Sequence, residues 1–311
     1  MISAVAHPNV ALIKYWGKSH DALRIPATPS ISIPLLALRT ETRIEVAPTH
    51  DEITISGQPD TSGRIGRWLH CLRGDFELDI PPLAVRSHSN FPLAAGLASS
   101  ASGFAALTLA INTLLDLDLD TASLSRLARL GSASAARSIT TGFVSLDGQA
   151  STHDAWRARK ALDWEDWPLG VCVAICSHAS KAVSSADGMR LSRDTSPAYT
   201  AWLEGNRRMY ARAARAVAER DFDALSAAAR WSFFGMLTVM QTSDPPLRYL
   251  NASTFAVIQA IDALREQGVP VFFTCDAGPQ VKCIHLPECA ELVEARIQAV
   301  PGVQEVIRAC P

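Results

Sequence analysis

The hydrophobic and polar positions of the chain alternate in some stretches and recur every three to four residues in others. Alternation is typical of strands and the longer period is typical of helices. Strands are predicted at residues 43–48, 52–57 (after a turn at 48–51), 82–92, 169–177, 269–278, 281–286 and 303–307. Helices are predicted at 63–73, at the end of 93–115, at 121–130, over 184–265 with breaks at Pro197 and 244–246, and at 288–298. This mixture, with a hairpin formed by 269–278 and 281–286, indicates an α+β fold rather than a doubly wound sheet.

One segment interrupts this pattern near the middle of the chain. Residues 154–168 are rich in charge and contain Trp156, Trp164 and Trp167. We interpret this segment as a hinge, which divides the chain into residues 1–168 and 169–311.

Composition limits the classes of function. The 311 residues carry a formal net charge of −2, with 48% hydrophobic and 19% charged residues. This supplies enough apolar material for one large domain or two fused lobes. A near-neutral charge gives no reason to expect a nucleic acid or an anionic membrane as partner, although a small anionic substrate remains compatible.

The N-terminus has no basic start and no unbroken apolar core, so we do not expect it to act as a secretory signal. The longest apolar stretch, 104–115, is too short to cross a bilayer and predicts a buried helix. Seven cysteines without a C-x-x-C pair indicate free thiols in a reducing cytoplasm. Scattered histidines give no reason to expect a structural metal.

The strongest chemical signal is the sequence PLAAGLASSASG at residues 92–103. Small residues allow close backbone approach, and the free N–H groups at a helix start attract anions. Ser99, Ser100 or Ser102 could add a hydroxyl to a phosphate or to Mg²⁺. The segment is neither a Walker loop nor a Rossmann fingerprint. Tight helix packing is an equally good explanation of its small residues.

Two other segments each carry one charged group in a setting suited to chemistry. Residues 131–144 are predicted to form a loop. Arg137 lies in its polar part, 131–138, where a guanidinium suits a carboxylate or phosphate. Asp276 follows an apolar strand and precedes a Gly-Pro turn, which makes it a candidate general base. A surface arginine and a turn-forming aspartate remain the alternatives.

The N-terminal stretch 13–18 places Lys14, Tyr15 and Lys18 beside a glycine. Along a strand the two lysines would share one face about 13 Å apart and attract a polyanion, unless they are simply solvated. Together the four segments supply a phosphate cradle, cationic groups and one carboxylate. Such a set suits phosphoryl transfer from ATP to a small anionic acid.

These segments resemble the mevalonate diphosphate decarboxylases of the GHMP kinase superfamily. The matching stretches are residues 9–18, 90–103, 124–138, 181–189, 245–253 and 273–282. They are spread over nearly the whole chain, in the order of the family. The resemblance implies an α+β, two-lobed GHMP kinase fold with a central cleft, an ATP-binding lobe at 1–168, a second lobe at 169–311, and a homodimer.

The resemblance also implies a reaction. ATP with Mg²⁺ phosphorylates the 3-hydroxyl of (R)-5-diphosphomevalonate, and loss of CO₂ and phosphate then gives isopentenyl diphosphate. Three alternatives stay open: the same chemistry on 5-phosphomevalonate, a 3-kinase that does not decarboxylate, and a non-catalytic relative that binds nucleotide or metabolite.

Site residues follow from the resemblance position by position. Asp276 corresponds to the residue that deprotonates or orients the 3-hydroxyl, Lys14 to its partner and Arg137 to the holder of the C1 carboxylate. The implied substrate-binding residues are Asn9, Tyr15, Lys18, Ser134, Lys181 and Ser185. The implied nucleotide-binding residues are Asn90, Gly96, Leu97, Ala98, Ser99 and Ser100, with Ser100 also a candidate ligand of the Mg²⁺ that accompanies ATP.

The chain departs from the family pattern at four places that we expect on the substrate side. Ala186 stands where some members carry an arginine to the terminal phosphate, and Leu237 stands where many have histidine. Gln280 replaces an asparagine, and Thr28-Pro29 replaces an asparagine-serine pattern. These changes bear on the group at C5 of the substrate, while the Asp276, Lys14 and Arg137 set favours decarboxylation.

Overall fold

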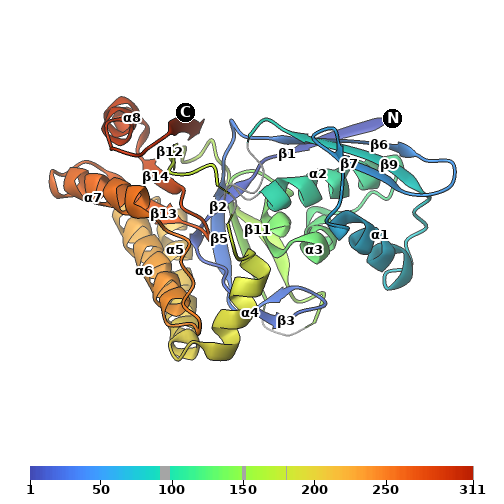
Figure 1. The fold of residues 1–311 in the computed structure, drawn as a ribbon, viewed down its shortest axis with the longest axis horizontal. Coiled ribbons are helices and arrows are strands. Elements are labelled where there is room, and N and C mark those ends of the chain that lie inside the picture. Colours follow the sequence, from blue (N-terminus) through green and yellow to red (C-terminus); the bar gives the residue numbers. More distant parts are fainter. Residues whose placement is uncertain (92–98, 149–151, 180, 311) are drawn as a thin grey trace.

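A computed structural model describes residues 1–91, 99–148, 152–179 and 181–310 of the chain. Two halves lie side by side with a smaller sheet between them (Figure 1). The first half holds a five-stranded sheet in the order β1 (Ile2–Ala6), β6 (Thr40–Val46), β9 (Leu83–Ser89), β7 (Glu52–Ile55) and β8 (Gln58–Pro59). Helices α1 (Arg64–Gly74), α2 (Ser99–Leu114) and α3 (Thr121–Gly131) pack with this sheet around one apolar core.

The middle sheet has the order β11 (Arg157–Leu162), β10 (Phe143–Asp147), β5 (Ser30–Pro34) and β2 (Asn9–Ile13). A short 3-10 helix, η1 (Ala133–Ser138), precedes β10, and a two-stranded hairpin of β3 (Lys18–His20) and β4 (Ile25–Pro26) lies beside it. The buried side chains of β2 and β5 share a core with helices of the second half. This shared core joins the two halves of the chain.

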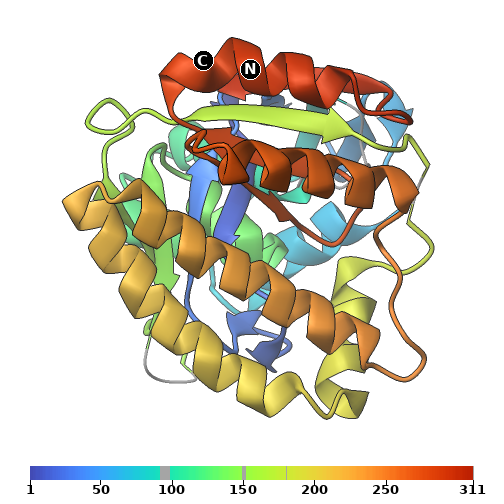
Figure 2. The same cartoon turned by 90° about the vertical axis from the view of Figure 1, so that its left-hand side faces the viewer.

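The second half contains a four-stranded sheet in the order β13 (Val271–Cys275), β14 (Val281–His285), β12 (Gly170–Ile175) and β15 (Glu305–Cys310). Its other elements are α4 (Ser185–Thr195), α5 (Tyr199–Glu219), α6 (Phe222–Gln241), α7 (Ala252–Glu266), η2 (Pro287–Cys289) and α8 (Ala290–Gln298). Figure 2 shows α5 and α6 lying side by side across this half. The structure confirms the α+β fold expected from the sequence, including the hairpin of β13 and β14.

Helix ends follow from local hydrogen bonding. The side chain of Asp120 accepts from the backbone N–H of Ser123 at the start of α3. Asn251 and Thr254 form a reciprocal capping box at the start of α7, which satisfies N–H groups that have no partner within the helix. The Asp221 side chain caps α6 by accepting from the backbone N–H of Ala224. Asp221 comes directly after the end of α5, and the sequence prediction missed this break between the two helices.

Four other expectations need correction. β6 and β7 do not pair across the turn at 48–51, because β9 lies between them and pairs parallel with β7. The segment 154–168 is not a hinge: it contains β11, and its three tryptophans are buried in the core. The stretch 131–144, predicted to be a loop, contains η1 and the start of β10.

Lys14 and Lys18 do not share one strand, because β2 ends at Ile13 and Gly17 separates the two lysines. Gly17 has a φ of +121°, and a side chain there would collide with the Tyr199 hydroxyl. A backbone of this kind is open to glycine, and it turns the chain between β2 and β3.

All seven cysteines are free thiols, as expected. Across the described ranges, none of the helices combines the length and apolar character that a bilayer crossing requires. Those ranges also contain no group of three or more His, Cys, Asp or Glu side chains placed to hold a metal.

Candidate active site

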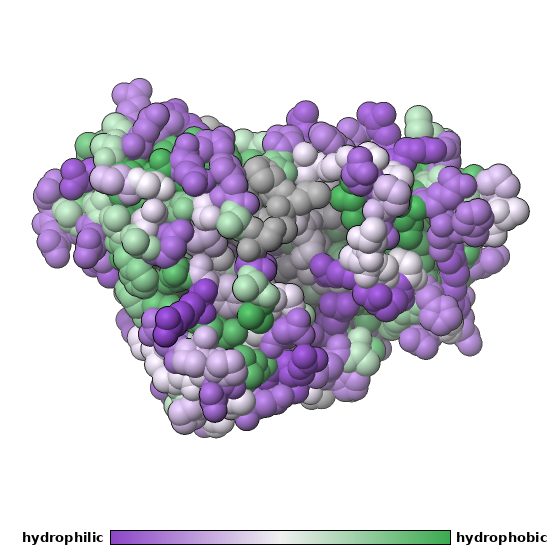
Figure 3. All heavy atoms as spheres, viewed as in Figure 1, coloured by the Kyte–Doolittle hydropathy of each residue, from purple (hydrophilic) through white to green (hydrophobic). Residues whose placement is uncertain are grey.

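A cavity of about 720 Å³ lies between the two halves of the molecule. Its walls come from the end of β2, the β3–β4 hairpin, the first turns of α2 and α4, η1, and the turn after β13. The space-filling view shows the surface hollowed between the halves (Figure 3). Segments far apart in the sequence therefore meet around one cavity that opens to the surface.

A carboxylate between two lysines occupies one end of the cavity. The Lys14 ammonium donates to Asp276 Oδ1 at 2.8 Å and to the Ala11 carbonyl at 2.7 Å. Lys282 Nζ lies 3.2 Å from Asp276 Oδ2. Both lysine side chains are 1% exposed, whereas 27% of the Asp276 side chain is exposed and faces the cavity. The arrangement leaves the aspartate as the accessible member of the cluster.

The lysines keep Asp276 ionised. Burial by itself raises the pKa of this carboxyl, but the charges and hydrogen bonds of Lys14 and Lys282 outweigh burial and hold the pKa well below its usual range. Burial lowers the pKa of Lys14, and the charge of Asp276 offsets only part of this effect. The group facing the cavity at neutral pH is thus a carboxylate with a buried cationic support.

Arg137 lies on η1 with a 3% exposed side chain. Its Nε donates to Ser32 Oγ at 3.0 Å, one terminal nitrogen donates to Ser30 Oγ at 2.6 Å, and the other to Asn9 Oδ1 at 3.4 Å. These partners are neutral, so they fix the orientation of the guanidinium without cancelling its charge. Burial lowers the pKa of Arg137, while the nearby charge of Asp276 raises it. A cation held this way suits an organic carboxylate.

The structure brings the predicted substrate-binding residues together. Tyr15, Lys18, Ser134, Lys181 and Ser185 all line the cavity with Asn9. The Lys181 ammonium donates to Ser185 Oγ at 2.8 Å and to the Ala277 carbonyl at 3.0 Å. The Tyr15 hydroxyl is buried and has no hydrogen-bond partner among the described residues. Buried polar groups in proteins are normally hydrogen-bonded to a protein group or to ordered water, and this hydroxyl can take such a partner from the cavity.

The structure describes some of the predicted nucleotide-binding residues. Ser99 and Ser100 line the cavity at the start of α2, and Ser100 Oγ lies 3.2 Å from Ser132 Oγ. Ser132 Oγ in turn lies 3.1 Å from Ser134 Oγ. These hydroxyls lie at or near the first described turn of α2, and the start of a helix is a setting that suits phosphate. Gly96, Leu97 and Ala98 lie outside the described residues.

Asn90 is placed elsewhere. Its side-chain amide donates to the Ala37 carbonyl at 2.9 Å and its Oδ1 accepts from the Arg39 N–H at 2.7 Å. It is absent from the described lining of the cavity. Asn90 thus stabilises the turn before β6, and its proposed contact with nucleotide stays a prediction.

Sequence reasoning missed four cations of the site: Lys282, Arg24, Arg64 and Arg67. Lys282 carried a usable signal, since it is the one lysine in an otherwise apolar strand, VKCIH. The three arginines lie in a turn and a helix, where charged residues are ordinary. Only the tertiary structure turns them toward the cavity.

We expected all four departures from the family pattern on the substrate side, and this expectation is wrong for most of them. Of the four positions, Ala186 is the one found among the described residues that line the cavity. Thr28 is fully buried and accepts from the Asn206 amide at 3.2 Å. Gln280 is also fully buried and bonds to the backbone of residues 176 and 177. Leu237 is partly buried against the core of the second half. Packing, rather than contact with substrate, therefore accounts for three of the four positions.

Comparison with known proteins places this cavity in context. Residues 6–156 match the diphosphomevalonate decarboxylase-like N-terminal domain, and residues 171–308 match the mevalonate 5-diphosphate decarboxylase C-terminal domain. The diphosphomevalonate decarboxylase of Saccharomyces cerevisiae is 34% identical over 309 residues, which cover 92% of this chain and 78% of that protein.

Solved structures agree along almost the whole chain. The mevalonate diphosphate decarboxylase of Staphylococcus aureus has a TM-score of 0.91 at 34% identity, covering 98% of this chain and 94% of that one. A structure of MDDEF in complex with MVAPP, AMPPCP and magnesium has a TM-score of 0.90 at 31% identity, covering 98% and 95%.

Proposed function

The chain belongs to the diphosphomevalonate decarboxylase family, and from this premise we propose that it converts (R)-5-diphosphomevalonate and ATP into isopentenyl diphosphate, CO₂, ADP and phosphate. The observation that carries the proposal is the convergence of Asp276, Lys14 and Arg137 on one cavity beside the start of α2. These groups come from three distant parts of the chain. Their placement matches the needs of a phosphorylation followed by an elimination.

The residues at the start of α2 fit the triphosphate of ATP. The first described residues of α2, Ser99 and Ser100, line the cavity with their hydroxyls, and the start of a helix favours an anion such as phosphate. Mg²⁺, when bound with ATP, neutralises phosphate charge, and Ser100 is the hydroxyl that we propose for it. The described residues offer no cluster of acidic ligands, which agrees with a metal held mainly through the nucleotide.

In the first step the 3-hydroxyl attacks the terminal phosphorus of ATP, the bond from that phosphorus to the bridging oxygen breaks, and ADP leaves. Asp276 accepts a hydrogen bond from the hydroxyl and takes its proton. The lowered pKa of Asp276 makes it a weak base, so it orients the hydroxyl first and receives the proton late. Lys14 supports the carboxylate from behind.

In the second step the C1–C2 bond breaks and its electron pair forms the C2–C3 double bond as the 3-phosphate leaves. This elimination needs the carboxylate aligned with the leaving group. Arg137 fixes the carboxylate, because its own orientation is set by Ser30, Ser32 and Asn9. Burial of the bound acid in the cavity limits the access of water to the electron-deficient C3.

The two products test the proposal directly. Purified protein with ATP and (R)-5-diphosphomevalonate should release CO₂ and ADP in equal amounts, because each phosphorylation is followed by one elimination. ADP without CO₂ would leave a 3-kinase. A higher rate with 5-phosphomevalonate would transfer the same chemistry to that acid, and nucleotide binding without either product would indicate a non-catalytic relative.

Deprotonation of Lys14 should set an alkaline limit on turnover. Its pKa lies below 10.5 because burial disfavours the charged ammonium. As the pH rises through this lowered pKa, the lysine loses the charge that supports Asp276. The decline of kcat at saturating substrates with rising pH should therefore begin before pH 10.5 is reached. In Lys14→Arg the residual activity should fall only at higher pH, since a guanidinium stays protonated. An unchanged alkaline limb in this variant would count against the role of Lys14.

The division of the chain into lobes at 1–168 and 169–311 is also our proposal, and the position of the two family matches on either side of it supports it. We further propose a cytoplasmic homodimer. Trp231 and Phe234 of α6 are each 40% exposed and offer an apolar surface that a second copy could cover. Sedimentation of the purified chain as a monomer would contradict the dimer.

A further inference from the structure

One cation of the cavity has no partner in the part of the chain that the structure describes. Arg24 ends the turn between β3 and β4 and lines the cavity. None of its guanidinium nitrogens makes a hydrogen bond or ion pair with a described residue. Arg64 and Arg67, which also line the cavity, differ from Arg24 because each makes a hydrogen bond within the protein. Arg64 donates to the Gly131 carbonyl and Arg67 donates to the Ser62 carbonyl.

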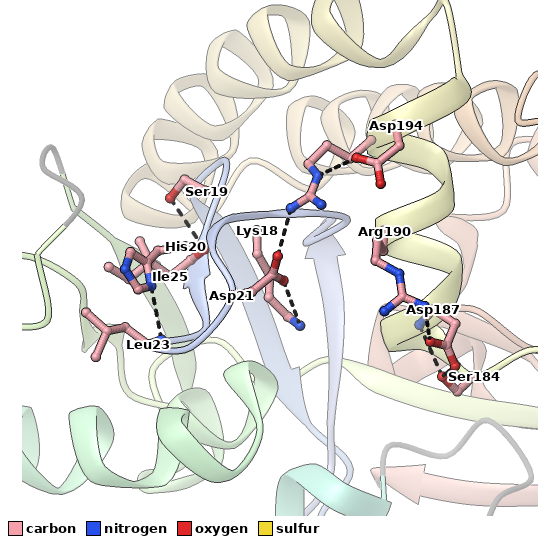
Figure 4. A network of polar contacts seen from close by, with 11 residues as sticks. Lys18, Ser19, His20, Asp21, Leu23, Ile25, Ser184, Asp187, Arg190 and Asp194 are labelled. Atoms are coloured by element: carbon pink, nitrogen blue, oxygen red, sulfur yellow. Dashed lines mark hydrogen bonds and ion pairs between the residues drawn. The ribbon is translucent and has the colours of Figure 1, made fainter. Parts of the chain in front are cut away.

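The nearest acid on the hairpin is already engaged. Asp21 Oδ1 lies 3.5 Å from the Lys18 ammonium, and its Oδ2 accepts from Arg193 of α4 at 2.9 Å. Figure 4 shows Asp21 between Lys18 and α4. Lys18 therefore has one acidic neighbour, which it shares with Arg193, whereas Arg24 has no acidic partner among the described residues. Burial lowers the pKa of Arg24, and neighbouring Arg67 lowers it further. An anion here would relieve both effects.

The position of Arg24 relative to Arg137 indicates which anion. Tyr15 is influenced by the charges of both arginines, and its buried hydroxyl lacks a partner among the described residues. All three side chains line the same cavity. The orientation of the acid in this cavity rests on the proposed function and deepens it. If the C1 carboxylate lies at Arg137 and the 3-hydroxyl at Asp276, the C5 end of the acid extends past Tyr15 toward Arg24.

The charge at this end distinguishes two related acids. A phosphate monoester carries a charge of about −1.5 to −2, and a diphosphate adds a further anionic group. Lys18 already shares Asp21 with Arg193, whereas Arg24 has no acidic partner among the described residues. A second phosphate needs a second cation, and the planar guanidinium of an arginine matches two phosphate oxygens at once.

We propose that Arg24 binds the distal phosphate of the 5-diphosphate and thereby makes the enzyme selective for 5-diphosphomevalonate over 5-phosphomevalonate. Arg24 is a specificity residue in this proposal and takes no part in the chemical steps. Its contribution should appear in binding of the diphosphate and be small for the monophosphate.

The test compares both acids in wild type, Arg24→Ala and Arg24→Lys. Removing a charge-assisted contact should raise KM for the diphosphate about ten- to hundred-fold. KM for 5-phosphomevalonate and for ATP should change less than about three-fold, so the preference between the two acids should largely disappear. Arg24→Lys should retain part of the preference because it keeps the charge. Calorimetric titration of each acid without ATP gives a readout that does not depend on turnover.

Arg190→Ala is the matched control. This exposed arginine of α4 pairs with Asp187 at 2.9 Å (Figure 4). It is not among the described residues that line the cavity, and its replacement removes the same formal charge. It should leave the preference unchanged. An unchanged preference in Arg24→Ala would overturn the proposal, and a rise in KM for ATP alone would assign Arg24 to the nucleotide. If wild type releases no CO₂ with either acid, the proposed function fails, while calorimetry still decides whether Arg24 selects the diphosphate.

Discussion

Asp276→Asn should lower kcat about a thousand-fold while the protein still binds ATP and 5-diphosphomevalonate. The amide keeps the size of the side chain but cannot accept the proton of the 3-hydroxyl. It also removes the charge that Lys14 and Lys282 surround at 2.8 and 3.2 Å. Single-turnover measurement of ADP and CO₂ should show that both products are lost together, because phosphorylation precedes elimination.

The loss of this charge also affects stability. Two buried ammonium groups without their carboxylate are unfavourable, and breaking a buried ion pair costs about 3–5 kcal/mol. Part of this cost should be avoided, because burial already lowers the pKa of Lys14 and the lysine can become neutral. Thermal unfolding of the variant should therefore remain cooperative, with a lowered Tm.

A second carboxylate between two cations provides the control. Asp262 lies 2.7 Å from Arg230 and 3.3 Å from Arg265, and its side chain is 31% exposed, close to the 27% of Asp276. It is not among the described residues that line the cavity. Asp262→Asn should lower Tm without a comparable loss of kcat. A kcat in Asp276→Asn equal to that of wild type would show that Asp276 takes no part in the chemical steps.

Arg137→Ala should reduce kcat/KM for 5-diphosphomevalonate by about two to four decades. The substitution removes the cation that holds the C1 carboxylate, and it leaves Ser30, Ser32 and Asn9 without their shared partner. Arg137→Lys should recover only part of the activity, since an ammonium keeps the charge but cannot maintain all three contacts. Steady-state release of CO₂ at varied substrate concentration measures the effect.

Arg129 provides the control that separates the catalytic role of Arg137 from the loss of stability caused by altering any buried arginine. It is fully buried and donates to the Leu23 and His153 carbonyls, and it is not part of the described cavity lining. Arg129→Lys should therefore lower stability much as Arg137→Lys does, but with little change in kcat/KM. Similar losses of kcat/KM in the two lysine variants would indicate that Arg137 acts only through the fold.

The sequence by itself determined the elements and most of the site. The period of the apolar residues predicted the buried strand β12, the β13–β14 hairpin and most of the helices, because side-chain direction depends on local backbone geometry. Asp276, Arg137 and Lys14 were identified because each stands in a short motif at a family-like position. Such motifs preserve chemistry locally and can be read without knowing what lies opposite.

Only the tertiary structure decided what pairs with what. The insertion of β9 between β6 and β7 joins residues that are distant in the chain, and no local pattern specifies that choice. The same holds for the three buried tryptophans of 154–168, whose charged surroundings in sequence suggested a hinge.

The charges of the site follow the same rule. Lys282 became a partner of Asp276 because the hairpin places Lys282 opposite Thr274, two residues before the aspartate. Arg24 has no ion-pair partner among the described residues, and Asp21 on the same hairpin pairs with Lys18 and with Arg193 from a helix of the other half. An electrostatic interaction depends on distance through space and on burial, and both are properties of the folded chain rather than of the order of its residues.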